Sequence, residues 1–369
     1  MTRKLRILST YVLLMVLPFS QQLIACTAIT LIAADGSLIQ ARTQEWGPFD
    51  LRSQVMFVSR GTDLVGTTPD GKPGLAWAAK YGVIGVNAND LPVFVDGMNE
   101  KGLAVSVLYL PGFSEFQTYM PSEASNTISG AEVSLWILTT LESVEEVKTE
   151  LPKINAVDVK LPSFGNIAPP IHLMVSDGNG ESIVVEYTDG NLDIYDNPVG
   201  VMTNSPSFPW HLTNLRNYVG LQPQSANPVT VGKLEITPIG VGSGMLGLPG
   251  DYTPPSRFIR AAALRNTAVE RETGEEVVFE SFRILDNFNI PSGSTAARDE
   301  VPTDGTLGST QWTTATDTKG LQYYYHTMAN RTLRKIDLRQ VDFSQGGIRF
   351  FPLDSVKEQT VEMVDINGG

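Results

Sequence analysis

The amino-acid sequence predicts an α+β protein built mainly of antiparallel strands. Runs of β-branched and apolar residues form two separate blocks, and segments with helical spacing lie between them. Two Asp-Gly pairs stand between such runs, which is the pattern of tight hairpins. Strands grouped in this way favour sheets packed in layers with helices over a sheet of alternating parallel strands and helices.

Two hairpins are expected from the turn signals. The first covers residues 26–42, CTAITLIAADGSLIQAR, with its turn at Asp35-Gly36. The second lies in SDGNGESIVVEYTDGNLDIYDN, where strands from Ser182 and from Leu192 flank another Asp-Gly pair. Both turns need residues that tolerate positive φ. Further strands are expected over residues 54–59, 102–109, 308–316 and 321–327.

Three helices are expected. Residues 131–141 place apolar side chains at helical spacing. Ser143 and Glu146 have the spacing of a capping box, so a short second helix should follow Ser143. The third is the segment SRFIRAAALRNTA, which begins at Ser256.

Residues 1–25 have the pattern of a secretory signal peptide. Three basic residues precede an almost wholly apolar run over residues 7–19, and Ala25 is the small residue before the cleavage point. The run is shorter than the roughly 20 residues that a membrane-spanning helix needs. We therefore expect an exported protein, periplasmic or extracellular, that starts at Cys26. Residues 26–369 contain no linker, charge run or repeat that would mark a boundary, so they should form one domain.

Composition and charge restrict the partners. Hydrophobic residues make up 42% of the chain and charged residues only 18%, which suits a globular enzyme with a large core. Removal of the leader lowers the formal net charge from −13 to −16, because three basic residues leave with it. Such an acidic surface argues against nucleic acid and anionic membranes as partners. With one cysteine and three histidines, metal-ligand spacing is absent, and no cofactor is expected.

The single cysteine, Cys26, has three interpretations. It can be a small buried apolar residue, as most free cysteines are. It can be the lipidated residue of a lipoprotein, because LIAC precedes the cleavage point in the required order. It can also be an amino-terminal nucleophile, whose own freed α-amine serves as the base for its thiol. A lone thiol in an oxidising compartment is liable to oxidation, so its presence there asks for a reason.

The third interpretation is chemically sound. An α-amine has a pKa of about 7.7–8.0 and a thiol one of about 8.5, so the two groups exchange a proton near neutral pH. No histidine is needed, and none of His172, His211 and His326 lies in an arrangement that suggests a base; His211 is expected to be structural. Arg42 ends the second strand of the opening hairpin, so it should lie beside Cys26 and favour the thiolate, unless it is an ordinary surface arginine.

Five motifs, in order, resemble the choloylglycine hydrolase family. They are Cys26-Thr27, RTQEW from Arg42, DGMNEKGLAVSVLYLPG from Asp96, TNSPSFPWHLTNLRNY from Thr203 and GLPGDYTPPSRFIRAA from Gly247. The family contains penicillin V acylases and conjugated bile salt hydrolases, which are cysteine amidases of the Ntn-hydrolase superfamily. The resemblance implies a four-layer αββα sandwich of two antiparallel sheets between helical layers, with Cys26 on a central strand.

The resemblance also implies catalytic roles. Cys26 would be nucleophile and base, and Arg42 would contact its thiolate. The side chain of Asn204 and the backbone amide of Tyr109 would stabilise the oxyanion, and Arg257 would complete the charged surroundings. A carboxylate near the amine would be Glu45, although the family usually has aspartate at this position.

Each of these residues has a plainer interpretation. Asn204 suits a tight bend before Ser-Pro, and Tyr109 stands where a strand should end. Arg257 could pair with Asp251 in the first turn of a helix. The extra methylene of Glu45 could spoil the site, which would leave an inactive homologue.

The substrate is expected to be a small-molecule acyl amide. Trp46, Phe49, Leu108 and Tyr109 could line a pocket for a hydrophobic acyl group, or could simply pack in the core. Tyr109 resembles the penicillin V acylase side of the family, and an exported form resembles its Gram-negative branch, for which acyl-homoserine lactones are another substrate. Phenoxyacetyl or fatty-acyl amides therefore rank above conjugated bile salts.

Two further expectations stay open. If Cys26 is lipidated, the chain is a membrane-tethered binding lipoprotein without chemistry, because lipidation consumes both the amine and the thiol. The resemblance also makes a homotetramer possible.

Overall fold

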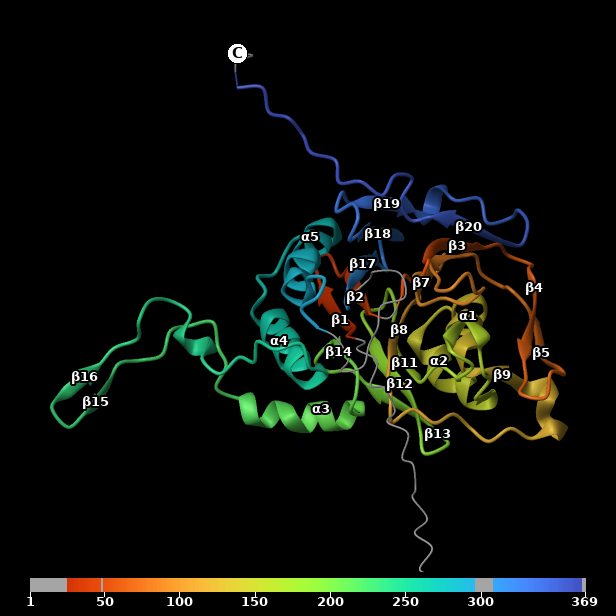
Figure 1. The fold of residues 1–369 in the computed structure, drawn as a ribbon, viewed down its shortest axis with the longest axis horizontal. Helices are drawn as coiled ribbons and strands as arrows, with labels where there is room; N and C mark the ends of the chain where they lie inside the picture. The colour runs from red at the N-terminus through yellow and green to blue at the C-terminus, as the bar shows by residue number, and fades with distance from the viewer. Residues whose placement is uncertain (1–24, 48, 296–307, 367–369) are drawn as a thin grey trace, which may run out of the picture.

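Two antiparallel sheets face each other at the centre of the molecule (Figure 1). The computed structural model describes residues 25–47, 49–295 and 308–366; the expected signal peptide therefore lies, apart from Ala25, outside the described residues. The first sheet has six strands in the order β14-β1-β2-β17-β18-β19 and the second has eight in the order β13-β12-β11-β8-β7-β6-β3-β20.

The strands of the first sheet are β1 (Thr27–Ile32), β2 (Leu38–Trp46), β14 (Val201–Met202), β17 (Ser309–Asp317), β18 (Gln322–Thr327) and β19 (Arg334–Asp337). Those of the second are β3 (Gln54–Val58), β6 (Val83–Val86), β7 (Asp96–Asn99), β8 (Ala104–Tyr109), β11 (Ile171–Ser176), β12 (Ser182–Thr188), β13 (Asn191–Asp196) and β20 (Ile348–Pro352). Three small ribbons add β4 (Asp63–Thr67) with β5 (Pro73–Ala78), β9 (Thr127–Ser129) with β10 (Asn155–Val157), and β15 (Val229–Val231) with β16 (Leu234–Ile236).

Helices cover the outer face of each sheet, which completes four layers (Figure 1). The helices α1 (Val133–Thr140) and α2 (Val144–Glu150) lie on the side of the eight-stranded sheet, whereas α4 (Pro254–Thr267) and α5 (Gly274–Leu285) pack on the six-stranded sheet. A further helix, α3 (Phe208–Asn214), follows β14. The expected α+β sandwich of two antiparallel sheets between helical layers is confirmed.

Period-two alternation along the strands explains why the layers stack. In β8, Ala104 and Leu108 face the other sheet, whereas Val105 and Val107 join the apolar cluster that includes α1. Successive side chains of a strand point to opposite faces, so an apolar run such as AVSVLY can bury both faces at once. Strand β8 therefore contributes to apolar layers on both faces of the eight-stranded sheet.

Both expected hairpins are present. Thr27 faces Thr43 and Ala28 faces Arg42 across the first hairpin, and Gly36 has φ of +81°. In the second hairpin Asp189 and Gly190 have φ of +50° and +74°, as a two-residue turn between right-twisted strands requires. The four other expected strands correspond to β3, β8, β17 and β18.

The helices differ from the expectation in one cap and in two additional helices. The hydroxyl of Ser143 accepts the Glu146 backbone N–H, but the Glu146 carboxylate accepts the Glu142 N–H, so only half of the expected capping box forms. Helices α3 and α5 were not expected, although Thr273 and Glu276 make a complete capping box at the start of α5. Among the described residues, no helix is long and apolar enough to cross a membrane.

The cap of α5 makes a measurable contribution to stability. Thr273→Ala removes the hydroxyl that accepts the Glu276 N–H, so we expect a loss of about 1 kcal/mol in the free energy of unfolding. Thr273→Ser keeps a hydroxyl and should stay close to the wild type. Urea unfolding of the three chains measures the difference; equal midpoints for the two variants would contradict the role of this cap.

Candidate active site

Cys26 lies directly before β1, at the interface of the two sheets. Its side chain is only 1% exposed and belongs to the apolar cluster between the six-stranded sheet and the facing residues of the second sheet. Ala25 is still joined to it, so the nitrogen described here is a peptide nitrogen in the position that the α-amine would take after cleavage. Because β1 pairs with β2, the pairing places Arg42 and Glu45 in the strand beside Cys26.

Asn204 joins three parts of the chain at this point. Its side-chain oxygen Oδ1 accepts the Cys26 backbone N–H at 2.8 Å and an Arg257 N–H at 2.7 Å. Its amide nitrogen Nδ2 donates to the Tyr109 carbonyl at 2.7 Å. Two N–H groups are available on an asparagine amide, so one remains for a further acceptor.

Arg257 is fully buried in the first turn of α4 and contacts the start of β1. It donates to the Cys26 carbonyl, to the Thr27 hydroxyl at 2.9 Å and to Asn204. Asp251 instead accepts from Thr253 and Ser256. Burial lowers the pKa of Arg257 to about 10, which still leaves it positively charged at neutral pH. The plainer interpretation, an Arg257–Asp251 pair, does not describe this structure.

Arg42 is buried and held by backbone carbonyls. Its guanidinium donates to the carbonyls of Val95, Val107 and Thr43 and stacks over the Trp312 ring at 4.9 Å. It is therefore no surface arginine. Among the described residues, no carboxylate forms an ion pair with it at contact distance, so its charge acts on the groups around it, including the Cys26 thiol.

Glu45 adds a buried carboxylate to the same cluster. Its Oε1 accepts the Thr310 hydroxyl at 2.8 Å, and Oε2 has no hydrogen-bond partner among the described residues. Burial raises the pKa of Glu45 from 4.5 to about 7, against the lowering effect of the Arg257 and Arg42 charges. A carboxyl group with such a pKa exchanges a proton near neutral pH.

Burial and the neighbouring charges shift the pKa of the Cys26 thiol in opposite directions. Burial raises the pKa of Cys26, the Arg42 charge lowers it, Glu45 raises it, and Arg257 lowers it. Because burial dominates, the thiol rests in its protonated form, and it must lose a proton before it can act as a nucleophile.

Tyr109 presents its backbone to the site. The Leu110 N–H donates to the Pro170 carbonyl in the pairing of β8 with β11, so the polar groups of Tyr109 point to the opposite side of the strand. Its carbonyl there accepts from Asn204. The backbone N–H of Tyr109 faces the same side, where the sequence analysis expected an oxyanion donor.

Aromatic rings cluster around Trp46 at the end of β2. Its ring makes edge contacts with Phe49, Tyr109 and Phe164 at centroid distances of 5.5, 5.8 and 5.8 Å. Phe49, Tyr109 and Phe164 are half-buried, whereas Leu108 is fully buried between the sheets. Phe164 was missed by the sequence analysis, because nothing local to it indicates that its loop meets β2.

The structure thus brings all six expected catalytic residues into one cluster. Thr310 joins this cluster, although nothing in the sequence beyond its strand pattern indicated that it would.

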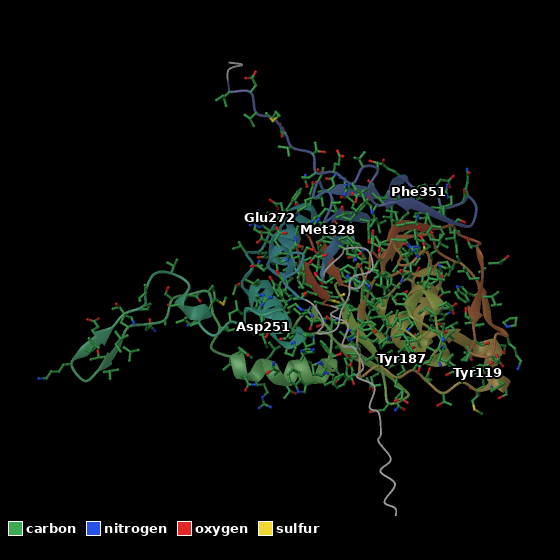
Figure 2. The ribbon with its side chains drawn as sticks, in the orientation of Figure 1. Tyr119, Tyr187, Asp251, Glu272, Met328 and Phe351 are labelled. Atoms are coloured by element: carbon green, nitrogen blue, oxygen red, sulfur yellow. The ribbon has the colours of Figure 1, made fainter. Side chains whose placement is uncertain are left out.

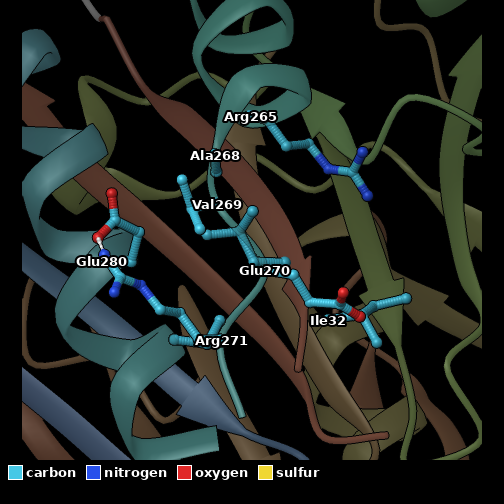
Figure 3. A pocket seen from close by; sticks show the side chains of 9 residues that line it. Ile32, Arg265, Ala268, Val269, Glu270, Arg271 and Glu280 are labelled. Carbon is cyan, nitrogen blue, oxygen red and sulfur yellow. Dashed lines mark hydrogen bonds and ion pairs between the residues drawn. The ribbon is translucent and has the colours of Figure 1, made fainter. Parts of the chain in front are cut away.

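A groove of about 280 Å³ lies at the opposite end of β1, lined by Ile32, Arg265 and Val269 among others (Figure 3). None of its residues belongs to the cluster. Over the described ranges, no group of three or more His, Cys, Asp or Glu side chains could hold a metal ion.

Glu45 makes the free energy of unfolding depend on pH. Its folded pKa of about 7 lies above the ordinary 4.5, so the folded chain keeps a proton that the unfolded chain releases between these values. This contribution to stability is full below about pH 4.5 and is lost as pH rises through about 7. Glu45→Gln cannot ionise and keeps an acceptor for Thr310. We expect its stability relative to the wild type to rise over this range by up to about 3 kcal/mol.

The measurement is urea unfolding of both chains, with Ala25 still joined to Cys26, across this pH range. A difference between the chains that does not change with pH would contradict the raised pKa of Glu45.

Comparison with known proteins agrees with this geometry. Residues 26–356 match the model of the linear amide C-N hydrolases, choloylglycine hydrolase family. A bile salt hydrolase/transferase of Clostridium perfringens is 35% identical over 88% of this chain and 96% of its own length. A penicillin V acylase of Pectobacterium atrosepticum is 27% identical over 84% of this chain and 79% of its own.

Solved structures show the same relationship. A conjugated bile acid hydrolase from Clostridium perfringens superposes with a TM-score of 0.79 at 32% identity, covering 92% of this chain and all of that one. A penicillin V acylase from Agrobacterium tumefaciens gives 0.71 at 27% identity, covering 89% and 92%. The chain belongs to the choloylglycine hydrolase family of linear amide C–N hydrolases.

Proposed function

We propose that this protein hydrolyses linear amides through a thioester on Cys26, after cleavage frees the α-amine of that residue. The observation that carries the proposal is the convergence on Asn204. Its side-chain oxygen accepts hydrogen bonds from the Cys26 N–H and from Arg257. Its amide nitrogen donates one N–H to the Tyr109 carbonyl and has a second N–H for a substrate. The nucleophile, its base and an oxyanion donor are then within one hydrogen-bonded unit.

Cleavage is the activating event in this scheme. A peptide nitrogen has its lone pair delocalised into the carbonyl, so the nitrogen of Cys26 cannot act as a base while Ala25 is attached. Once free, the amine takes the thiol proton, and the charges of Arg42 and Arg257 favour the thiolate. The proposal therefore includes export and removal of residues 1–25, with a periplasmic or extracellular location.

The reaction then follows acyl transfer. The thiolate attacks the amide carbonyl, and the oxyanion accepts the free Asn204 N–H and the Tyr109 backbone N–H. The ammonium group of Cys26 gives its proton to the leaving nitrogen. Water, activated by the same amine, attacks the thioester and releases the acid.

The aromatic cluster supports a phenoxyacetyl-type acyl group as substrate. The Trp46 ring makes edge contacts with Phe49, Tyr109 and Phe164 next to the site, and the ring of a phenoxyacetyl group could make the same kind of edge or offset contact with them. Conjugated bile salts are the second candidate, because the relatives named for them are more similar to this chain than the penicillin V acylases are. Acyl-homoserine lactones are a third amide to test.

A test of the function combines mass and kinetics. The protein is expressed as the complete chain and purified after export. It should have the mass of residues 26–369 and should gain one alkyl group from iodoacetamide, because Cys26 is the only cysteine. It should hydrolyse penicillin V, and Cys26→Ala should lower kcat/KM at least about a thousandfold. Glycocholate and an acyl-homoserine lactone, assayed in parallel, decide the substrate class.

The outcomes separate the alternatives. A lipid mass on Cys26 or a different first residue would remove the base and support the tethered lipoprotein. If glycocholate gives the highest kcat/KM, the aromatic cluster does not select a phenoxyacetyl group, and conjugated bile salts become the substrate class. Phe49→Ala should cost about tenfold in kcat/KM for penicillin V if this ring contacts the acyl group.

We further propose that the chain forms homotetramers through the arm between α3 and α4. This arm, with β15 and β16, projects away from the body, and its side chains meet no opposing layer (Figures 1 and 2). Its exposed apolar residues are Val219, Val229, Val231, Leu234, Ile236, Ile239, Val241 and Leu246. Apolar surface on this scale marks a protein interface, and a second copy is the partner that the family resemblance favours.

Light scattering tests the assembly. Wild-type protein should have four times the mass of the chain, and Ile239→Glu with Val241→Glu should lower the oligomeric state, because both side chains are fully exposed in the single chain. A wild-type monomer, or a variant with unchanged mass, would contradict an interface made by this arm.

A further inference from the structure

Two ionisable side chains are buried beside the site without a role in the chemistry above. His172 on β11 and Glu186 on β12 lie opposite each other. They are the residues next to Leu173 and Val185, which are paired in the antiparallel ladder of these two strands. His172 and Glu186 are 1% and 0% exposed. Burying such groups costs free energy unless every polar atom is satisfied, so the pair calls for an explanation.

The pair reaches from the eight-stranded sheet to the segment that follows β14 in the other sheet. His172 Nδ1 lies 2.9 Å from Glu186 Oε1, and His172 Nε2 lies 2.8 Å from the Thr203 carbonyl. Both oxygens of Glu186 accept the Phe208 N–H, at 3.0 and 3.1 Å. The two side chains therefore hold both ends of residues 203–208.

The proton positions follow from these contacts. A carbonyl only accepts hydrogen bonds, so Nε2 of His172 carries a proton and donates it to Thr203. One more proton lies between Nδ1 and Oε1, which leaves no polar atom of the pair unsatisfied. On the other side of the segment, His211 Nε2 donates to the Asn204 carbonyl at 2.8 Å, while its ring stacks on Phe258.

Two consecutive carbonyls, those of Thr203 and Asn204, are thus each held by a histidine. The Asn204 side chain has only two torsions of its own, so the backbone at these residues decides where its amide lies relative to Cys26 and Tyr109. We propose that His172 and Glu186 are positioning residues, which hold residues 203–208 so that Asn204 can stabilise the oxyanion. The inference rests on the proposed function, because it assigns the pair to that reaction.

Positioning matters here because small displacements are costly. A shift of about 1 Å in a catalytic group can lower a rate by about a hundredfold. A pair that only stabilised the fold would change unfolding without acting through Asn204. Dependence on Asn204 is therefore the property that separates the two roles.

The test uses two amides of different length at residue 172. Glutamine places its amide nitrogen near the position of Nε2 and keeps a donor for Thr203, whereas asparagine reaches only the position of Nδ1 and leaves that carbonyl without its donor. We expect His172→Asn to lower kcat by on the order of 30- to 100-fold with KM changed less than about twofold, because only the transition state loses stabilisation. His172→Gln should stay within about threefold of the wild-type kcat.

A double-mutant cycle with Asn204→Ala completes the test. Removing an oxyanion donor costs about 10²–10³ in kcat and leaves a measurable rate. In that background His172→Asn should cause no further loss beyond about twofold, because the residue through which it acts is gone.

Glu186→Gln is the second variant, for the case that asparagine at 172 prevents folding. The new amide can accept from the Phe208 N–H and donate to His172, so this variant should keep most of the activity.

The outcomes are distinct. Wild-type kcat in His172→Asn, or a loss that persists in the Asn204→Ala background, would overturn the positioning role alone. A Glu186→Gln chain that folds but loses as much kcat as Asn204→Ala would overturn it as well. A processed wild type that cleaves none of the three amides would overturn the proposed function, and with it this role.

Discussion

The hydrogen bonds of one amide side chain, that of Asn204, tie together the parts of the chain on which the site depends. Its partners are Cys26, 178 residues away in sequence, Tyr109, 95 residues away, and Arg257, 53 residues away. They come from the start of β1, the end of β8 and the first turn of α4. These contacts form only when the two sheets and the helical layer over the first are all in place, so the geometry of the site is a property of the whole sandwich.

The charges around the thiol show how the fold manages burial. Arg42 and Arg257 are both fully buried, and each donates most of its hydrogen bonds to backbone carbonyls or neutral side chains rather than to carboxylates. A buried arginine without a carboxylate at contact distance leaves a net positive field in a medium of low dielectric constant. This field opposes the effect of burial on the pKa of the thiol, whereas the charge of Glu45, whose own pKa is about 7, adds to that effect.

The sequence predicts the local elements well and their ends less well. Asp-Gly turns and period-two alternation identify the hairpins because both depend on neighbouring residues. Helix α5 was not predicted, even though Thr273 and Glu276 stand at capping-box spacing and apolar residues such as Val277, Val278 and Ile284 follow them at helical spacing. The reverse error occurs at Ser143, where the same spacing yields half a box because Glu146 turns to the N–H of Glu142. A capping pattern permits two hydrogen bonds, and only the surrounding backbone decides which of them form.

The sequence by itself determined the features that lie within one hairpin or one motif. It placed Arg42 beside Cys26, because a hairpin of that length must bring its ends together, and it identified the family from five ordered motifs. The resemblance implied that Asn204, Tyr109 and Arg257 act at Cys26, and only the tertiary structure showed the hydrogen bonds that join them there. Only the tertiary structure decided that Phe164 joins Trp46, and that His172 and Glu186 hold the backbone before and after Asn204. It also decided the pKa of Glu45. The physical reason is that burial and contact depend on atoms contributed by segments far apart in sequence, whereas turns and strands depend on their neighbours.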